Sequence, residues 1–199
     1  MKARKSEATE RFARALARRP RNPEPRYADP KARQIARSPI SRVLAIDPGY
    51  DRCGIAVVEG DPSRPTLLMS GCVVPAAGAR ATRLARVSQA VTSAIKKYRP
   101  NSLAIETLFF SINKKTAIGV AEARGAILAA AGAAALPVLE CSPQQVKSAV
   151  TGYGNADKAA IARMIPKLLA LPRPPAGKKR LDDELDAIAI GITALARSH

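Results

Sequence analysis

The sequence of 199 residues lacks Trp altogether, and only 4% of its residues are aromatic. Its only histidine, His199, is the last residue, and we assign it no catalytic role. Hydrophobic residues make up 47% of the chain, which is enough for a core. Because aromatic residues are so scarce, that core must be aliphatic and rich in alanine.

Cysteines and long apolar runs are also scarce. Cys53, Cys72 and Cys141 form no C-x-x-C pair, which argues against both a disulfide framework and a zinc site. We expect them to be buried free thiols in a reducing cytoplasm. No run of 18 apolar residues could span a bilayer, and residues 1–10 lack the apolar core of a secretory signal.

Positive charge is abundant, with a formal net charge of +17. A protein this basic is expected to bind a polyanion, and nucleic acid is the favoured candidate. A membrane surface is the alternative. It is disfavoured because no predicted helix combines a basic face with large apolar anchors.

Residues 1–42 differ in composition from the remainder. They hold 13 Lys or Arg against 4 Asp or Glu, and five prolines. Such a segment buries little apolar surface and is expected to be a largely disordered basic arm, in which a short helix can form over residues 6–19. It either contacts DNA backbone or serves as a solubilising tail, and its four acids count against a transit peptide. Residues 43–199 form the predicted compact domain.

The spacing of apolar residues in this domain predicts alternating strands and helices. Three strands over 43–46, 54–58 and 66–74, joined by short turns at 48–51 and 60–65, are typical of an antiparallel meander. Two more strands are predicted over 103–105 and 137–141. Helices are predicted over 80–98, 117–135, 143–150, 157–171 (interrupted by Pro166) and 181–196. This order indicates an α/β fold.

Two of the predicted strands end on a carboxylate. Asp47 follows the apolar run 43–46 and precedes the turn Pro48–Gly49, and Glu106 follows the run 103–105. Taken singly, Asp47 could be an ordinary turn acid and Glu106 a surface glutamate.

The last predicted helix begins with a cluster of acids. Asp183 and Asp186 are three residues apart and therefore share a helix face. Apolar residues follow Asp186 directly, so we expect this face to point inward, toward the strand ends. Asp182 can share that face as well, and spacing alone does not choose between Asp182 and Asp183. Taken alone, Asp183 could be a helix cap.

A carboxylate cluster in a strongly basic chain needs a cation, because like charges raise one another's pKa and destabilise the cluster. Mg²⁺ binds a few carboxylates together with water and phosphate oxygens. Two such ions about 4 Å apart can activate water and stabilise the leaving oxygen in phosphodiester cleavage. An acidic metal pocket within a basic protein therefore predicts a nuclease whose base is metal-bound water.

Six short motifs occur in order along the chain. They are Ile46–Gly49, Ala104–Glu106 followed by Phe109, Ala123–Gly125, Gln145–Lys147, Gly152–Lys158 and Asp183–Ala187. In this order and spacing the chain resembles the RuvC family of Holliday-junction resolvases, the crossover junction endodeoxyribonucleases, over nearly all of residues 43–195. The resemblance implies an RNase H-like α/β fold: a mixed five-stranded sheet, its first three strands antiparallel, flanked by helices.

The resemblance also implies roles for individual residues. The metal-binding catalytic carboxylates would be Asp47, Glu106, Asp183 and Asp186, which favours Asp183 over Asp182. The catalytic, DNA-contacting lysines would be Lys147 and Lys158, and further DNA contacts would be Phe109, Lys114 and Lys115, the two lysines lying in a variable loop. Lys158 could instead be a solvated helix lysine, and Phe109 a core residue beside Phe110.

The implied activity is Mg²⁺-dependent resolution of four-way DNA junctions by symmetric paired nicks during recombination and repair. Two Mg²⁺ ions per active site are expected, with Mn²⁺ able to substitute. The implied assembly is a homodimer that packs through the helix over 117–135. A branch-migration motor is a possible partner. The implied location is a bacterial or phage-like cytoplasm. The basic connector over 172–180 could clamp DNA or be a flexible linker.

Other functions remain open at this point. The chain could be an RNase H-like nuclease acting on another nucleic acid, such as an RNA–DNA hybrid, or a non-catalytic junction-binding protein. The retained carboxylates argue against an inert scaffold, which would gain stability by losing them. An actin-like ATPase is disfavoured because about 157 residues cannot supply two large lobes.

Overall fold

The computed structural model describes residues 42–108, 114–172 and 180–197. Its sheet consists of β1 (Arg42–Asp47), β2 (Cys53–Asp61), β3 (Arg64–Val73), β4 (Ser102–Glu106) and β5 (Val138–Cys141). The strand order is β3-β2-β1-β4-β5, in which β1 and β3 are antiparallel to β2 while β4 and β5 run parallel to β1. The predicted mixed five-stranded sheet, with its first three strands antiparallel, is confirmed. The basic arm predicted for residues 1–42 falls almost wholly outside the described residues.

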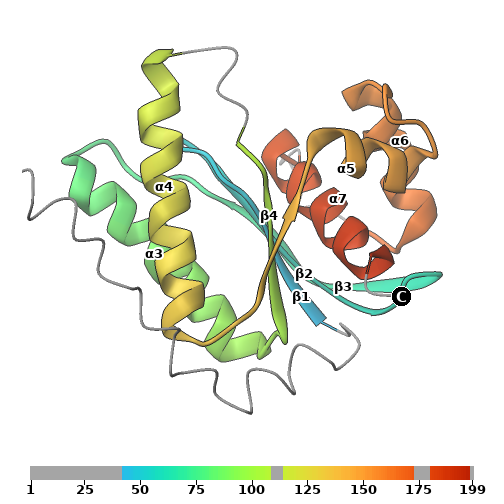
Figure 1. Ribbon diagram of the computed structural model, residues 1–199, viewed down its shortest axis with the longest axis horizontal. Coiled ribbons are helices and arrows are strands. Elements are labelled where there is room, and N and C mark those ends of the chain that lie inside the picture. The colour runs from blue at the N-terminus through green and yellow to red at the C-terminus, as the bar shows by residue number, and fades with distance from the viewer. Residues whose placement is uncertain (1–41, 109–113, 173–179, 198–199) are drawn as a thin grey trace, which may run out of the picture. The chain divides into compact units, whose positions relative to one another are not determined.

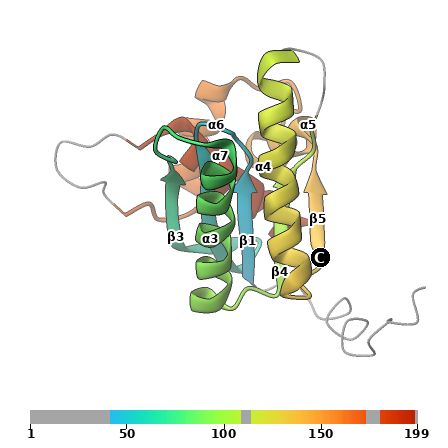
Figure 2. The same cartoon turned by 90° about the vertical axis from the view of Figure 1, so that its left-hand side faces the viewer.

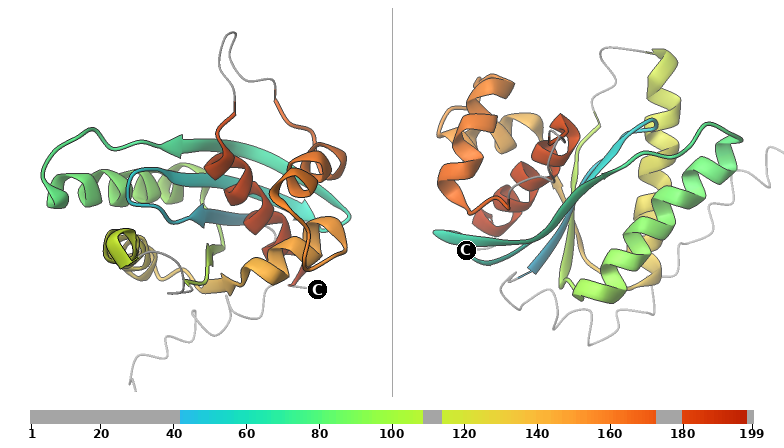
Figure 3. Two further views of the ribbon diagram at one scale, coloured as in Figure 1. Left: turned by 90° about the horizontal axis from the view of Figure 1, so that it is seen from above. Right: turned by 180° about the vertical axis from the view of Figure 1, so that it is seen from behind.

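Five helices among the described residues flank this sheet. They are α3 (Arg80–Tyr98), α4 (Lys114–Ala133), α5 (Pro143–Thr151), α6 (Lys158–Leu168) and α7 (Asp182–Ala196). Figures 1 and 2 show α3 and α4 covering one face of the sheet, and Figure 3 shows α5, α6 and α7 on the opposite face. The sheet is therefore the middle layer of three.

Alternation along the strands divides the core between the two faces of the sheet. In β1, Val43 and Ala45 pack with α7, whereas Leu44 and Ile46 pack on the side of α3 and α4. All four are fully buried, as expected for a central strand whose two faces are both covered.

Helix α7 lies very close to the sheet. At Gly191, an added Cβ would stand 2.7 Å from the Val58 side chain and 3.3 Å from the Cβ of Ala45. Every residue from Ala187 to Leu195 is buried, because the sheet covers one side of α7 while α5 and α6 cover another. Small residues at this contact bring the first turn of α7 near the strand ends.

Two of the sequence-based helix boundaries were wrong. Helix α4 begins at Lys114, so Lys114 and Lys115 lie in its first turn and not in a loop, and it ends two residues early, before Ala135, whose φ of 53° is left-handed. Apolar periodicity could not reveal a polar first turn. Helix α6 continues through Pro166 without interruption and ends at Leu168, because Leu169 adopts an extended conformation.

The three cysteines are free thiols; Cys53 and Cys141 are buried, and Cys72 is half-buried. None of the helices in the described ranges is both long enough and apolar enough to cross a membrane.

Candidate active site

Asp47 and Glu106 end two neighbouring parallel strands on the same face of the sheet. Ile46 of β1 pairs with Ile105 of β4, so the residues that follow them are adjacent. Alternation places Asp47 on the same side as Ala45, and Glu106 on the same side as Ala104, which is the side that α7 covers. Both carboxylates therefore face α7 at the carboxyl edge of the sheet, where open α/β sheets bind ligands.

The first turn of α7 meets these strand ends at Gly54. A Cβ on Gly54 would overlap the backbone oxygen of Asp183, so only glycine permits this approach. Gly54 is paired with Asp47 across β1 and β2. The close contact thus brings Asp183 beside the strand that carries Asp47.

The four carboxylates line one cavity of about 240 Å³. They come from the ends of β1 and β4 and from the first turn of α7, and two lysines complete the polar lining, Lys147 of α5 and Lys158 of α6. Pro143, Val146, Ile161 and Ile190 supply its apolar wall. Residues up to 143 positions apart in the sequence thus share one site.

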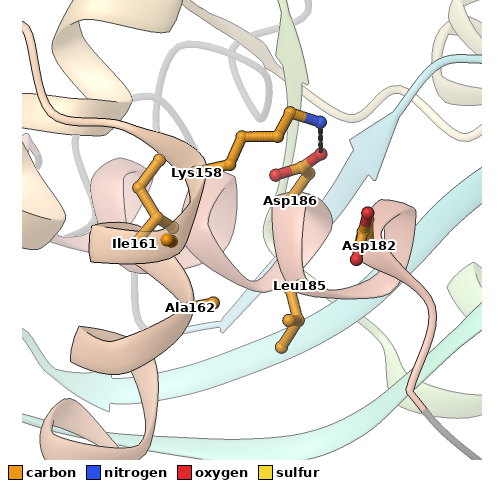
Figure 4. Close-up of a pocket in the computed structure, with 7 residues that line it drawn as sticks. Lys158, Ile161, Ala162, Asp182, Leu185 and Asp186 are labelled. Atoms are coloured by element: carbon orange, nitrogen blue, oxygen red, sulfur yellow. Dashed lines mark hydrogen bonds and ion pairs between the residues drawn. The ribbon is translucent and has the colours of Figure 1, made fainter.

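Asp182 lies outside this cavity. It lines an adjacent hollow of about 250 Å³ together with Leu185 and Ala162. Figure 4 shows Asp182 and Asp186 pointing in different directions from the first turn of α7, with Lys158 reaching toward Asp186. Of the two candidates that spacing left open, Asp183 is therefore the one inside the cavity.

Burial and mutual repulsion hold Asp47 partly protonated near neutral pH. Burial is the largest cause and the charges of Glu106, Asp186 and Asp183 add to it, raising the pKa of Asp47 to about 7 from its ordinary 3.8. Burial, and then the charge of Asp186, also raises the pKa of Glu106. The cluster carries more negative charge than its surroundings compensate.

Lys158 compensates part of that charge. Its Nζ donates a hydrogen bond to Asp186 Oδ2 at 3.0 Å, and this bond is the main cause of the raised pKa of Lys158. The lysine therefore stays protonated near neutral pH. Lys147 is half-buried and makes no ion pair or hydrogen bond through its side chain with the described residues, so its ammonium group is available to a ligand.

Arg52 compensates Asp183 incompletely. Its Nε lies 3.1 Å from Asp183 Oδ2, yet that oxygen is buried and has no aligned hydrogen-bond donor among the described residues. A buried carboxylate oxygen without an aligned hydrogen bond is costly, and a hard cation is a partner that suits it.

These residues fit a divalent cation by their chemistry. The acids are all oxygen donors, as Mg²⁺ prefers, and Asp183 Oδ2 lacks a hydrogen-bond partner in the described structure. As they stand, no three His, Cys, Asp or Glu side chains within residues 42–108, 114–172 and 180–197 are arranged to hold a metal ion. Two of the acids instead contact Lys158 and Arg52.

The thiol nearest the cluster is a poor nucleophile. Burial raises the pKa of Cys53 to about 12, so the thiol stays protonated near neutral pH. Covalent catalysis by this cysteine is therefore not supported.

The chain is similar to known proteins over residues 43–194. A family model described as "Crossover junction endodeoxyribonuclease RuvC" matches residues 43–194. The chain belongs to the RuvC family. The family predicted from the motifs is thus confirmed, and with it an endodeoxyribonuclease.

Individual RuvC proteins agree over most of the domain. RuvC of Parafrankia sp. (strain EAN1pec) is 41% identical over 158 residues, covering 78% of this chain and 86% of that protein. The structure of Thermus thermophilus RuvC in complex with Holliday junction substrate has a TM-score of 0.70 at 33% identity, covering 77% of this chain and 92% of that one. The yeast mitochondrial Holliday junction resolvase Ydc2 shares the fold. Its structure has a TM-score of 0.58 at 16% identity and covers 84% of this chain and 87% of that one.

Some predicted DNA contacts cannot be placed. Phe109 lies outside the described residues, and only the helical backbone is described at Lys114 and Lys115. Their contact with DNA stays a prediction.

Arginines that support the carboxylates were missed from sequence. Arg124, inside a RuvC motif, donates from Nη1 to the backbone oxygen of Glu106 at 2.8 Å and pairs through Nη2 with Glu140 at 2.7 Å. Its side chain is only 12% exposed, so it ties α4 to the ends of β4 and β5. The position of Arg124 inside the motif was the one sequence feature that could have identified it. No feature of the sequence could have identified Arg52.

Proposed function

We propose that this RuvC-family chain resolves four-way DNA junctions by divalent-metal-dependent phosphodiester hydrolysis. One observation carries the proposal. Four acids from three separate elements line a single cavity in a chain of net charge +17. The family supports the DNA endonuclease activity, and the relative from T. thermophilus was captured with a Holliday junction substrate.

Asp47, Glu106, Asp183 and Asp186 would hold the cations, two Mg²⁺ per site, with Mn²⁺ able to substitute. When bound, such ions supply an activated water and neutralise the scissile phosphate. The raised pKa of Asp47 makes this carboxylate dependent on a cation, since without one it stays partly protonated near pH 7.

Lys147 and Lys158 would bind the DNA backbone beside the cavity. Lys147 has no ionic partner in the described structure, and a protonated lysine near the scissile phosphate offsets charge that develops there. Lys158 also fixes Asp186 through its hydrogen bond of 3.0 Å. In this proposal the lysines hold the substrate and the acids hold the ions.

We infer that two copies assemble through α4. The exposed side of this helix carries the spacing of one helical face, with Ile118 61% exposed and exposed small residues at Gly125, Ala129 and Gly132. Small residues allow two helices to approach closely. A homodimer would present two active sites to a junction, as symmetric paired nicking requires.

Other parts of the proposal rest on the sequence and the family. The segment that precedes β1 would act as a basic arm of the nuclease domain, and the domain itself includes Arg42, because this residue begins β1. A cytoplasmic location and a branch-migration motor as partner would follow from bacterial RuvC relatives, and neither is tested by the geometry.

The experiment is a paired cleavage assay on a synthetic four-way junction and an RNA–DNA hybrid duplex, each with Mg²⁺ and with EDTA. We expect symmetric nicks in the junction with Mg²⁺ alone. Asp47→Asn should abolish cleavage and leave junction binding in EDTA intact. Cleavage of the hybrid in preference to the junction would refute the proposed substrate, and wild-type cleavage by Asp47→Asn would refute the site.

A further inference from the structure

The N-terminal part of α7, which carries Asp183 and Asp186, is attached to the edge strand β3 by a largely buried polar cluster. Ser70 Oγ donates to Glu184 Oε1 at 2.6 Å, and Arg180 Nη1 donates to Ser70 Oγ at 2.9 Å. Arg180 also pairs with Glu184 one helical turn away. The Arg180 and Glu184 side chains are each only 14% exposed.

Arg180 also makes a contact outside this pair. Its Nη2 donates to the backbone oxygen of Pro172 at 2.7 Å. One guanidinium thus binds a hydroxyl on β3, a carboxylate on α7 and a backbone carbonyl eight positions earlier in the sequence. The forked guanidinium reaches these partners from two nitrogens, Nη1 and Nη2, whereas the three donors of a lysine all leave one nitrogen.

Helix α7 needs such support because its start is otherwise poorly held. Leu181 occupies the N-cap position and no side chain caps the helix. Ser, Thr, Asp or Asn would normally satisfy the free N–H groups there. Arg180 supplies a cation beside acids that would otherwise repel one another.

The cluster and the Gly54 contact hold the same turn from two strands. Gly54 of β2 meets the backbone of Asp183, while Ser70 of β3 holds Glu184, the next residue. Gly54 pairs with Cys72 and Ala56 with Ser70, so the two contacts lie two residues apart along the sheet. Together they restrict both the approach and the rotation of the turn.

We propose that Arg180, Glu184 and Ser70 form a positioning clamp that orients Asp183 and Asp186 for cation binding. The clamp residues lie outside the lining of the catalytic cavity and act through the helix. This inference rests on the proposed function, because it assumes that the two aspartates bind the cation. It adds three positioning residues, of which Ser70 and Arg180 lie outside the family motifs and Glu184 lies within the last one.

The test measures Mn²⁺ binding by isothermal titration calorimetry on the full chain without DNA. Arg180→Gln should raise the Mn²⁺ dissociation constant by about 10- to 100-fold, the usual effect of removing a group that supports a metal ligand. The Mg²⁺ concentration for half-maximal junction cleavage should rise by a similar factor. Junction affinity in EDTA should stay within about twofold of wild type.

Two further variants keep the test informative if Arg180→Gln does not fold. Arg180→Lys retains a cation beside Glu184 but cannot reach all three partners, and Ser70→Ala removes one donor to Glu184 and keeps the ion pair. Both should fold and show smaller increases in the dissociation constant than Arg180→Gln. Wild-type Mn²⁺ affinity in both would overturn the clamp.

Arg197→Gln is the matched control. Arg197 lies just after the opposite end of α7, and its Nη1 donates to the backbone oxygen of Glu140 at 2.6 Å. This variant should lose thermal stability and keep wild-type Mn²⁺ affinity. An equal loss of affinity in Arg197→Gln and Arg180→Gln would show that general destabilisation, and not positioning, is responsible.

Asp47→Asn separates failure of the clamp from failure of the proposed function. If this variant loses Mn²⁺ binding while the clamp variants keep it, the clamp alone is refuted. If Asp47→Asn itself binds Mn²⁺ and cleaves like wild type, the proposed active site is refuted and the clamp with it.

Discussion

Replacing Asp47 with Asn should stabilise the metal-free protein at pH 8. Burial and the neighbouring carboxylates raise the pKa of Asp47 to about 7 from 3.8. A tenfold change in a proton-binding constant is worth about 1.4 kcal/mol. The difference in pKa therefore corresponds to a cost of about 4 kcal/mol when Asp47 is ionised in the folded protein, and Asn removes that charge.

The stabilisation should depend on pH in a defined direction. Between about pH 4 and pH 7 the folded protein retains a proton on Asp47 that the unfolded chain has released. The free energy of unfolding therefore falls as the pH rises through this window, and the full cost is present above it. The advantage of Asn should be smallest at pH 4, intermediate at pH 5 and largest at pH 8.

Urea unfolding followed by circular dichroism in EDTA measures this effect at pH 5 and pH 8. At pH 8 the variant should gain as much as about 4 kcal/mol, which is a rise of roughly 8–16 °C in Tm for a domain of this size. Added Mg²⁺ should stabilise wild type and not the variant, because only a bound cation shifts the unfolding equilibrium.

Asp182→Asn is the control, since this exposed acid lies in the first turn of α7, next to Asp183, but outside the cavity that Asp47 lines. It should change stability by less than about 1 kcal/mol. An Asp47→Asn variant that is no more stable than wild type at pH 8 in EDTA would refute the repulsive carboxylate cluster. An advantage of equal size at pH 5 and pH 8 would refute it as well.

Three other perturbations test separate parts of the site. Gly54→Ala should displace Asp183 and abolish cleavage while junction binding in EDTA survives; normal cleavage would contradict the close contact. Arg124→Ala should cost about 1–3 kcal/mol in urea unfolding, because it leaves the partly buried carbonyl of Glu106 without this donor, and a neutral result would remove Arg124 from the support of β4. Lys147→Ala should reduce the salt dependence of junction binding by about one unit of slope, as loss of one phosphate contact predicts, and an unchanged slope would place Lys147 away from the DNA.

The sheet and its carboxylates could be predicted because their signals are local. An apolar run that stops on an acid marks both Asp47 and Glu106, and parallel pairing of their strands brings such ends together. The predicted helix over 80–98 agrees with α3, because apolar residues recur at helical spacing from Leu84 to Ile95.

The supporting arginines could not be predicted because their partners are distant in sequence. Arg180 contacts Ser70 across 110 positions, and Arg52 contacts Asp183 across a similar separation. In a chain with 33 Lys or Arg, one more arginine gives no local signal. Spacing alone could not choose between Asp183 and Asp182; the family resemblance favoured Asp183, and the close contact at Gly54 shows how the folded sheet brings Asp183 beside Asp47.

The most direct test of the central claim is a crystal structure of the protein soaked with Mn²⁺, with data collected at the manganese absorption edge. We predict anomalous peaks in the cavity, within coordination distance of Asp47, Glu106, Asp183 and Asp186, and their loss in Asp47→Asn crystals. If a preparation that cleaves junctions showed no peak in this cavity, or bound Mn²⁺ only elsewhere, the four carboxylates would not be the metal site and the account would be wrong.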